Sequence, residues 1–184
     1  MRSDGKIGRL VQILVICIAL LWAAGAGAVD RPIEDFYGEF TGRSVSGGDK
    51  VSARDINVEI KGIRRGFNVS WTTVTLREGG KAKRKSYSID FRKTKRDGIF
   101  QSAMRKDVFG NRAPNDPMRG DPYVWARVRG DTLTVYALIV TADGSYDMQV
   151  YDRTLTKNGM TLDFKRFLEG QEVKAIKGEL QRIK

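Results

Sequence analysis

Residues 86–92 read Ser-Tyr-Ser-Ile-Asp-Phe-Arg, and this strict alternation of polar and apolar side chains decides the fold class. Successive side chains of an extended strand point to opposite faces, so a period of two is typical of a strand with one buried face. Residues 56–60 and 145–150 alternate in the same way. Helical periodicity is nearly absent, although residues 99–109 fit either a short helix or a strand followed by a loop.

Turn signals separate these runs at short intervals. Gly stands beside Asp or Asn at Asp97-Gly98, Gly130-Asp131, Asp143-Gly144 and Asn158-Gly159. Such pairs favour tight hairpins because Gly, Asn and Asp tolerate a positive φ. The chain is therefore predicted to be all-β, an antiparallel up-and-down meander of about eight to ten strands. A meander hides its edges best by closing into a barrel, which is our prediction; a two-sheet sandwich is the alternative and needs longer connections.

Two stretches depart from simple alternation. Phe67 and Trp71 lie on one parity, whereas Val74 lies on the other. A β-bulge at residues 72–73 would restore the phase and curve the strand. Residues 132–140 are apolar on both parities from the second position onward, so we expect this strand to be covered on both faces.

Residues 1–28 have the three-part pattern of a secretory signal peptide, expected to form an N-terminal signal helix. A basic region precedes an apolar region, and Ala26-x-Ala28 is a small-residue cleavage pattern. Cleavage after Ala28 would leave residues 29–184 as a single β-barrel domain. The single cysteine, Cys17, would leave with the signal, and a cysteine-free exported domain suits a bacterial periplasm. An uncleaved membrane anchor is the alternative.

The residue inventory excludes several kinds of chemistry. The chain has no histidine, which removes Ser-His-Asp and Cys-His nucleophiles, Cys/His zinc sites and histidine-ligated haem. Asp116 and Asp121 are close in a proline-rich loop, but two acids in a loop are too common to indicate glycoside chemistry. We expect no catalytic residues, no metal and no cofactor, and an enzyme is the least favoured function.

Two short motifs lie near the ends of the expected domain. Residues 36–42 read Phe-Tyr-Gly-Glu-Phe-Thr-Gly, similar to the Gly-x-Trp that opens the first strand of lipocalins, with Phe40 at the tryptophan position. Residues 176–182 read Ile-Lys-Gly-Glu-Leu-Gln-Arg, similar to the closing Gly-x-Leu of such barrels. The chain thus resembles the lipocalin or calycin group. The resemblance implies a cup that holds a small apolar or amphipathic molecule.

The apolar members of the alternating runs are the candidate lining of this cup. They are also the default core of any barrel, and both interpretations stay open. The candidate ligand-binding residues on these runs are Phe67, Trp71, Tyr87, Phe91, Tyr146 and Met148.

Residues 123–129 offer a further candidate pair, Trp125 and Arg127, on one parity. If this parity faces inward, Arg127 would lie beside Trp125 and could pair with a ligand carboxylate, because a buried guanidinium needs an anion. If it faces outward, the two residues belong to an exposed aromatic and cationic stripe. The alternation leaves both orientations open.

The positive charge is concentrated. The chain carries a formal charge of +11, and residues 77–106 hold eleven Lys or Arg against three acidic residues. A basic hairpin over residues 81–96 would attract anionic lipid or an acidic protein partner. The candidate residues for such an anionic surface are Lys83, Arg84, Lys85, Lys93, Lys95 and Arg96. Nucleic acid is a poor candidate, since few aromatic side chains accompany the charges.

Two functions therefore follow from the sequence. The first is an exported periplasmic barrel that binds a small apolar or amphipathic ligand. The alternative is an envelope interaction or scaffold protein that docks on anionic lipid or a protein partner through the 81–96 segment. No oligomeric state is predicted.

Overall fold

The computed structural model describes residues 29–45, 54–76, 82–103, 105–106, 112–113 and 115–184. The expected signal peptide at residues 1–28 lies outside the described residues. Within them the chain is built almost wholly of strands. These are β1 (Gly38–Val45), β2 (Arg54–Ile63), β3 (Gly66–Leu76), β4 (Ala82–Lys93), β5 (Ile99–Ser102), β6 (Arg105–Lys106), β7 (Arg112–Ala113), β8 (Tyr123–Arg129), β9 (Thr132–Val140), β10 (Tyr146–Thr156), β11 (Gly159–Leu168) and β12 (Gln171–Arg182).

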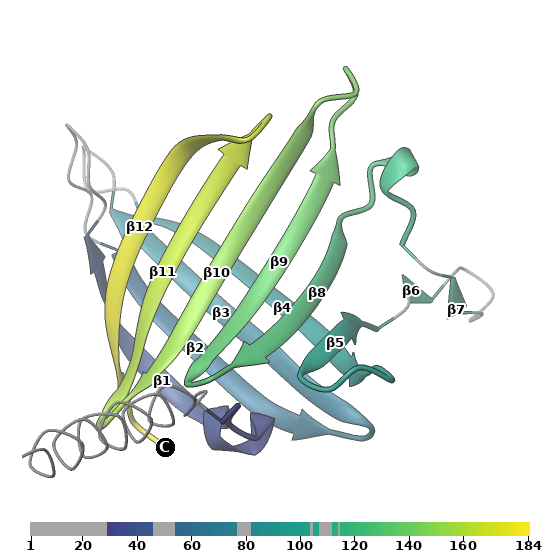
Figure 1. Ribbon diagram of the computed structural model, residues 1–184. Helices are drawn as coiled ribbons and strands as arrows, with labels where there is room; N and C mark the ends of the chain where they lie inside the picture. Colours follow the sequence, from purple (N-terminus) through teal and green to yellow (C-terminus); the bar gives the residue numbers. More distant parts are fainter. Residues whose placement is uncertain (1–28, 46–53, 77–81, 104, 107–111, 114) are drawn as a thin grey trace, which may run out of the picture.

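Ten of these strands form one closed antiparallel barrel (Figure 1). Their order around the barrel is β1-β12-β11-β10-β9-β8-β5-β4-β3-β2, so nearly every strand pairs with its neighbours in sequence. β6 and β7 form a separate two-stranded ribbon. The predicted all-β meander and its closure into a barrel are confirmed, and the sandwich alternative is wrong. The alternative of a helix over residues 99–109 is also wrong for residues 99–102, which form β5.

The barrel is closed on one side by a very short strand. β5 pairs with three residues of β4, Phe91–Lys93, and with three residues of β8, Trp125–Arg127. Toward the other end of β4, residues 82–90 pair with β3 alone among the described strands. The wall is therefore continuous at the end of the barrel that contains Phe91–Lys93. It is joined less completely at the end that contains residues 82–90 of β4.

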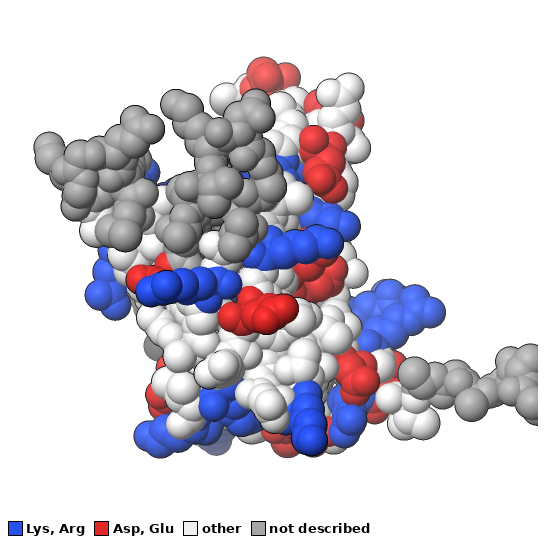
Figure 2. All heavy atoms as spheres, turned by 90° about the vertical axis from the view of Figure 1, so that its left-hand side faces the viewer, with Lys and Arg blue, Asp and Glu red and all other residues white. Residues whose placement is uncertain are grey.

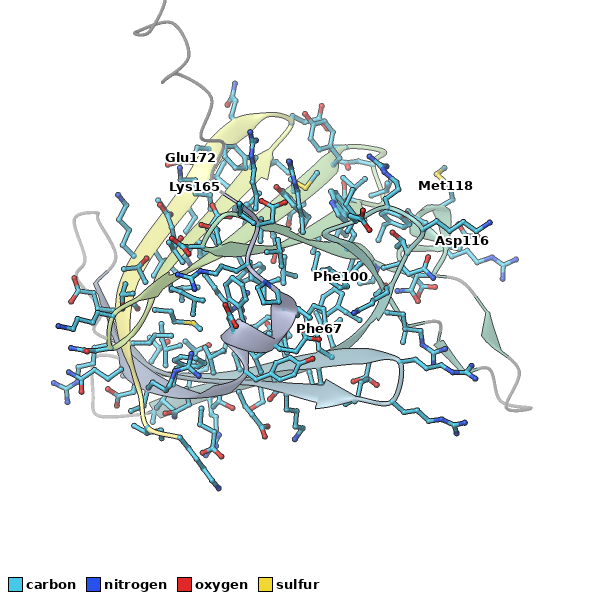
Figure 3. The ribbon with its side chains drawn as sticks, turned by 60° about the horizontal axis from the view of Figure 1, so that its bottom comes forward. Phe67, Phe100, Asp116, Met118, Lys165 and Glu172 are labelled. Atoms are coloured by element: carbon cyan, nitrogen blue, oxygen red, sulfur yellow. The ribbon has the colours of Figure 1, made fainter. Side chains whose placement is uncertain are left out.

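The continuous end is filled with apolar side chains. Phe67 is fully buried; its ring stacks on Phe91 at 5.1 Å between centroids and meets the edge of Phe100 at 4.9 Å. A 3-10 helix, η1 (Ile33–Phe36), lies across this end and buries Ile33 and Phe36 (Figure 3). The predicted inward run of Ile56, Val58 and Ile60 on β2 is buried as well, with Ile60 nearest to this end. This end is a packed core rather than a cup.

The β-bulge predicted at residues 72–73 is wrong. β3 keeps an unbroken register with both neighbours: Thr73 lies opposite Ile56 on β2 and opposite Lys85 on β4. The inward parity of Phe67 and Trp71 therefore continues to Thr73, and Val74 lies on the outer wall. The expectation failed because the barrel interior becomes polar toward the end that is remote from η1, where Thr73 faces inward. Apolar character therefore no longer marks the inner face of β3 there.

Candidate ligand-binding cavity

A cavity of about 330 Å³ occupies the part of the barrel remote from η1. Its walls come from strands on both sides of the barrel, including β2, β3 and β4 on one side and β10, β11 and β12 on the other. The apolar and aromatic lining residues are Ile56, Val58, Trp71, Tyr87, Tyr151, Leu162, Phe164 and Ile176. A concave site with an aromatic wall is typical of small-molecule binding. Polar and charged residues complete the lining: Ser44, Thr73, Thr75, Lys83, Lys85, Arg153 and Lys174.

The aromatic rings of the cavity touch across the barrel. Trp71 of β3 stacks on Tyr87 of β4 with 5.0 Å between ring centroids. On the opposite wall, Tyr151 of β10 lies 5.3 Å from Trp71 and 4.6 Å from Phe164 of β11. Rings are stiff side chains with large apolar faces, so this belt offers a preformed contact surface.

Arg153 is the most unusual residue of the cavity. Its side chain is only 1% exposed, and its guanidinium carbon lies 5.2 Å from the Trp71 ring centroid and 5.7 Å from that of Tyr151. Its Nε and Nη1 atoms have no hydrogen-bond partner. Burial lowers the pKa of Arg153 to about 10, so it remains a cation at neutral pH. A buried cation that only aromatic faces accompany is costly, because ring faces replace water poorly.

Further cations line the cavity. Lys83 and Lys85 of β4 and Lys174 of β12 belong to its wall together with Arg153. Lys83 and Lys85 are exposed, and their parity matches that of Tyr87, so they stand at the opening. No carboxylate belongs to the described lining. The cavity therefore presents a positive potential to an entering molecule.

A polar chain runs along the inner face of β10 beside the cavity. Buried Asp147 accepts a hydrogen bond from Nε of Arg166 at 2.9 Å, and Nη2 of Arg166 forms an ion pair with the same carboxylate oxygen at 2.8 Å. Further along the strand, the Tyr151 hydroxyl donates to Oε1 of Gln149 at 3.0 Å. This chain holds the Tyr151 ring in place against Trp71. It also gives Arg166 of β11, whose side chain is exposed, a carboxylate partner.

Comparison of the chain with protein-family models and with curated proteins finds no match. Among the described residues, no helix is long and apolar enough to cross a membrane. The cavity, with its aromatic belt and buried arginine, is the strongest indication of function in the described part of the chain.

The structure divides the predicted lining residues into three groups. Trp71 and Tyr87 line the cavity. Phe67 and Phe91 face inward as well, but both are fully buried in the packed core.

The third group lies on the outer wall. Trp125 stacks on Tyr136 there, and Arg127 is exposed, so the outward alternative for residues 123–129 holds. The predicted inward orientation of Tyr146 and Met148 is wrong. β10 turns the opposite parity inward, with Asp147 and Arg153 buried, and its apolar parity continues the outer face of β9. The predicted cover of residues 132–140 on both faces is met only in part: Leu133, Thr134 and Val135 are buried, and the other residues of β9 are half-buried.

The predicted basic hairpin over residues 81–96 is also wrong as a structure. β4 is a single strand, with Lys83, Arg84 and Lys85 near one end and Lys93 at the other, close to Lys95 and Arg96. At about 3.3 Å per residue, the two clusters lie about 30 Å apart along the barrel. They do not form one surface, and two members of the first cluster turn toward the cavity.

The outer wall seen in Figure 2 carries basic and acidic side chains interspersed rather than a field of one sign. Exposed ion pairs on β1 and β2, such as Arg43 with Asp55 and Lys61 with Glu59, combine the two signs. Exposed pairs of this kind contribute little to stability. The described part of this wall therefore offers no concentrated positive patch.

Sequence reasoning missed the residues of the second cavity wall, above all Arg153 and Tyr151. One signal was present: the parity of β10 that was assigned to solvent carries a tyrosine and an arginine two residues apart. That pattern is ordinary in an outward face and informative only once the face is known to point inward.

The ionisation of Tyr151 tests the burial of this wall. Burial raises the pKa of Tyr151 to about 12, from 10.0. Since the folded pKa is the higher, the stability contributed by the neutral phenol is complete below pH 10 and is lost as the pH rises toward 12. We expect a near-ultraviolet phenolate titration to contain one step at about pH 12 that disappears in Tyr151→Phe. Tyr123→Phe on the outer wall is the control and should retain the step; a wild-type titration without it would contradict the burial.

Proposed function

We propose that the protein is an exported, periplasmic barrel that binds a small amphipathic ligand inside its cavity. The observation that carries the proposal is that one end of the barrel is packed solid while the other keeps an aromatic-lined space of about 330 Å³. This volume falls near the lower end of the usual range for small-molecule pockets. The three-part pattern of residues 1–28 supports export, and the two terminal motifs support a lipocalin-like cup.

The physical driving force is the removal of apolar surface from water. Burial contributes about 25 cal/mol per Å² on both ligand and protein. Rings already held against one another lose little conformational freedom when the ligand enters, so less of that free energy is lost to ordering. Polar and cationic groups at the opening and in the wall orient the polar part of the ligand.

Two tryptophans provide a matched test. We expect Trp71→Ala to weaken binding of the uncharged probe N-phenyl-1-naphthylamine by at least about tenfold, because Trp71 contributes the largest ring of the cavity. Trp125→Ala removes the same side chain from the outer wall and should leave the affinity unchanged. Fluorescence titration of the delipidated protein measures both, with circular dichroism to confirm that each variant is folded.

Equal losses in the two variants, or full binding in folded Trp71→Ala, would place the probe outside the cavity. If the wild type binds no apolar probe but binds anionic vesicles in a salt-dependent manner, docking through the exposed basic residues of β4 replaces ligand binding as the function.

A further inference from the structure

Two buried polar groups in the wall of the cavity lack partners. One is the Arg153 guanidinium, through Nε and Nη1; the other is the Ser44 hydroxyl, whose residue is fully buried. Both residues line the same cavity. Buried polar groups in native proteins are nearly always hydrogen-bonded, so each unpaired one needs an explanation.

The two groups belong to one row of the barrel wall. Ser44 of β1 lies opposite Gly178 of β12, Gly178 lies opposite Leu162 of β11, and Leu162 lies opposite Arg153 of β10. A Cβ at position 178 would stand 3.3 Å from the Cβ of Ser44. Because Gly178 has no side chain, nothing at that position covers Ser44. The row therefore places a hydroxyl and a guanidinium on the same inner surface.

The other arginine on the inner face of this wall behaves differently. Arg166, whose side chain is 45% exposed, donates one hydrogen bond to Asp147 and forms an ion pair with it, so both the protein and water compensate its charge. Among the described residues, no carboxylate forms an ion pair with Arg153, and Asp152 beside it lies on the opposite face of β10, where it accepts a hydrogen bond from Thr134. The buried charge of Arg153 is the one left for an external partner.

We propose that Arg153 and Ser44 form a head-group site for the carboxylate of an amphipathic ligand. This inference rests on the proposed function and deepens it by naming the class of ligand. Nε and Nη1 together offer three N–H donors and Ser44 offers one O–H, while an ionised carboxylate only accepts. A hydrogen bond between charged groups gains strength where water is excluded.

The charge balance selects a monoanion. Arg153 is the buried cation of the described lining, whereas Lys83, Lys85 and Lys174 are exposed. One carboxylate therefore balances the buried charge, whereas a phosphate dianion would bring a second negative charge into the buried part. The acid group thus points inward to Arg153, and the apolar part contacts Trp71, Phe164 and Ile176. The exposed Lys83 and Lys85 attract the anion during entry. They do not hold its head group, because an exposed lysine is already hydrated and gains little from an ion pair.

The test compares decanoate, decanol and decyl phosphate by calorimetry on the delipidated wild-type protein. We expect decanoate to bind at least about tenfold more tightly than decanol, because it adds charge-assisted hydrogen bonds in a buried site. Decyl phosphate should bind more weakly than decanoate. The preference for the acid should persist in high salt, since a buried pair is poorly screened.

Variants then assign the preference to residues. Arg153→Met should lower decanoate affinity at least about tenfold and leave decanol affinity unchanged, and Ser44→Ala should lower decanoate affinity by a smaller factor. Arg127→Met is the matched control, because it removes an exposed arginine from the outer wall. If Arg153→Met does not fold, the acid-to-alcohol ratio of the wild type and its salt dependence still decide the question.

The outcomes separate the two proposals. Binding of neither decanoate nor decanol by the wild type overturns the proposed function itself. Equal affinity for the two overturns the head-group site and leaves the cup in place. A preference for the acid that disappears in salt, or that Lys83→Gln and Lys85→Gln remove while Arg153→Met does not, places the head group at the opening and also overturns the inference. A preference for decyl phosphate overturns the choice of a carboxylate.

Discussion

Phe67→Ala is expected to lower the free energy of unfolding by about 3–5 kcal/mol, the usual cost of truncating a fully buried phenylalanine. The Phe67 ring contacts Phe91 of β4 and Phe100 of β5. β5 is the short strand that closes the barrel by joining β4 to β8. Removing it leaves a hole that backbone hydrogen bonding on both sides prevents from collapsing. Urea unfolding followed by circular dichroism measures the change.

Gln101→Ala is the control for this substitution. Gln101 follows Phe100 on β5 but is exposed, so its replacement should change stability by no more than about 0.5 kcal/mol. A loss below about 1 kcal/mol in Phe67→Ala would mean that the closed end is loosely packed, and the division of the barrel into core and cup would fail.

Gly42→Ala is expected to destabilise the barrel by about 1–3 kcal/mol, and more if the strands must separate. A Cβ on Gly42 would lie 1.9 Å from the carbonyl oxygen of Glu179 and 2.9 Å from the Cα of Leu180. Both obstacles are backbone atoms of β12, so no side chain can turn away to make room. The pairing of β1 with β12, which joins the two ends of the meander, must shift instead.

Hydrogen exchange locates this damage. Amides of β1 and β12 should exchange faster in Gly42→Ala, while those shared by β8 and β9 should change little. Arg43→Ala next to it removes only an exposed ion pair with Asp55 and should cost less than about 1 kcal/mol. Wild-type stability in Gly42→Ala would contradict the close approach of the two strands.

The fold could be predicted from the sequence because alternation and turn residues are local signals. The run around Ile89 and Phe91 and the Asp-Gly and Asn-Gly pairs identified strands and hairpins without knowledge of tertiary structure. Alternation separates two faces of a strand, however, and does not say which one points inward. Where the interior is apolar, as at Phe67 and Val58, assigning the apolar face to the inside was correct.

The assignment failed where the interior becomes polar. On β10 the inner face carries Asp147, Tyr151 and Arg153, while Met148 lies outside against the apolar outer face of β9. The hypothesis that an arginine pairs with a ligand carboxylate was attached to Arg127, whereas the buried arginine without a carboxylate partner is Arg153. Only the register of all the strands around the barrel, which no short stretch encodes, distinguishes the two.

The brevity of β5 also bears on where the barrel wall opens most easily. Three residue pairs on each of its sides hold the seam, whereas β10 and β11 share ten. Local openings occur where few backbone hydrogen bonds must break. The barrel wall is thus extensively hydrogen-bonded from β10 to β12 and least so at β5. Amides of β5 should therefore exchange with solvent faster than those of β10 and β11.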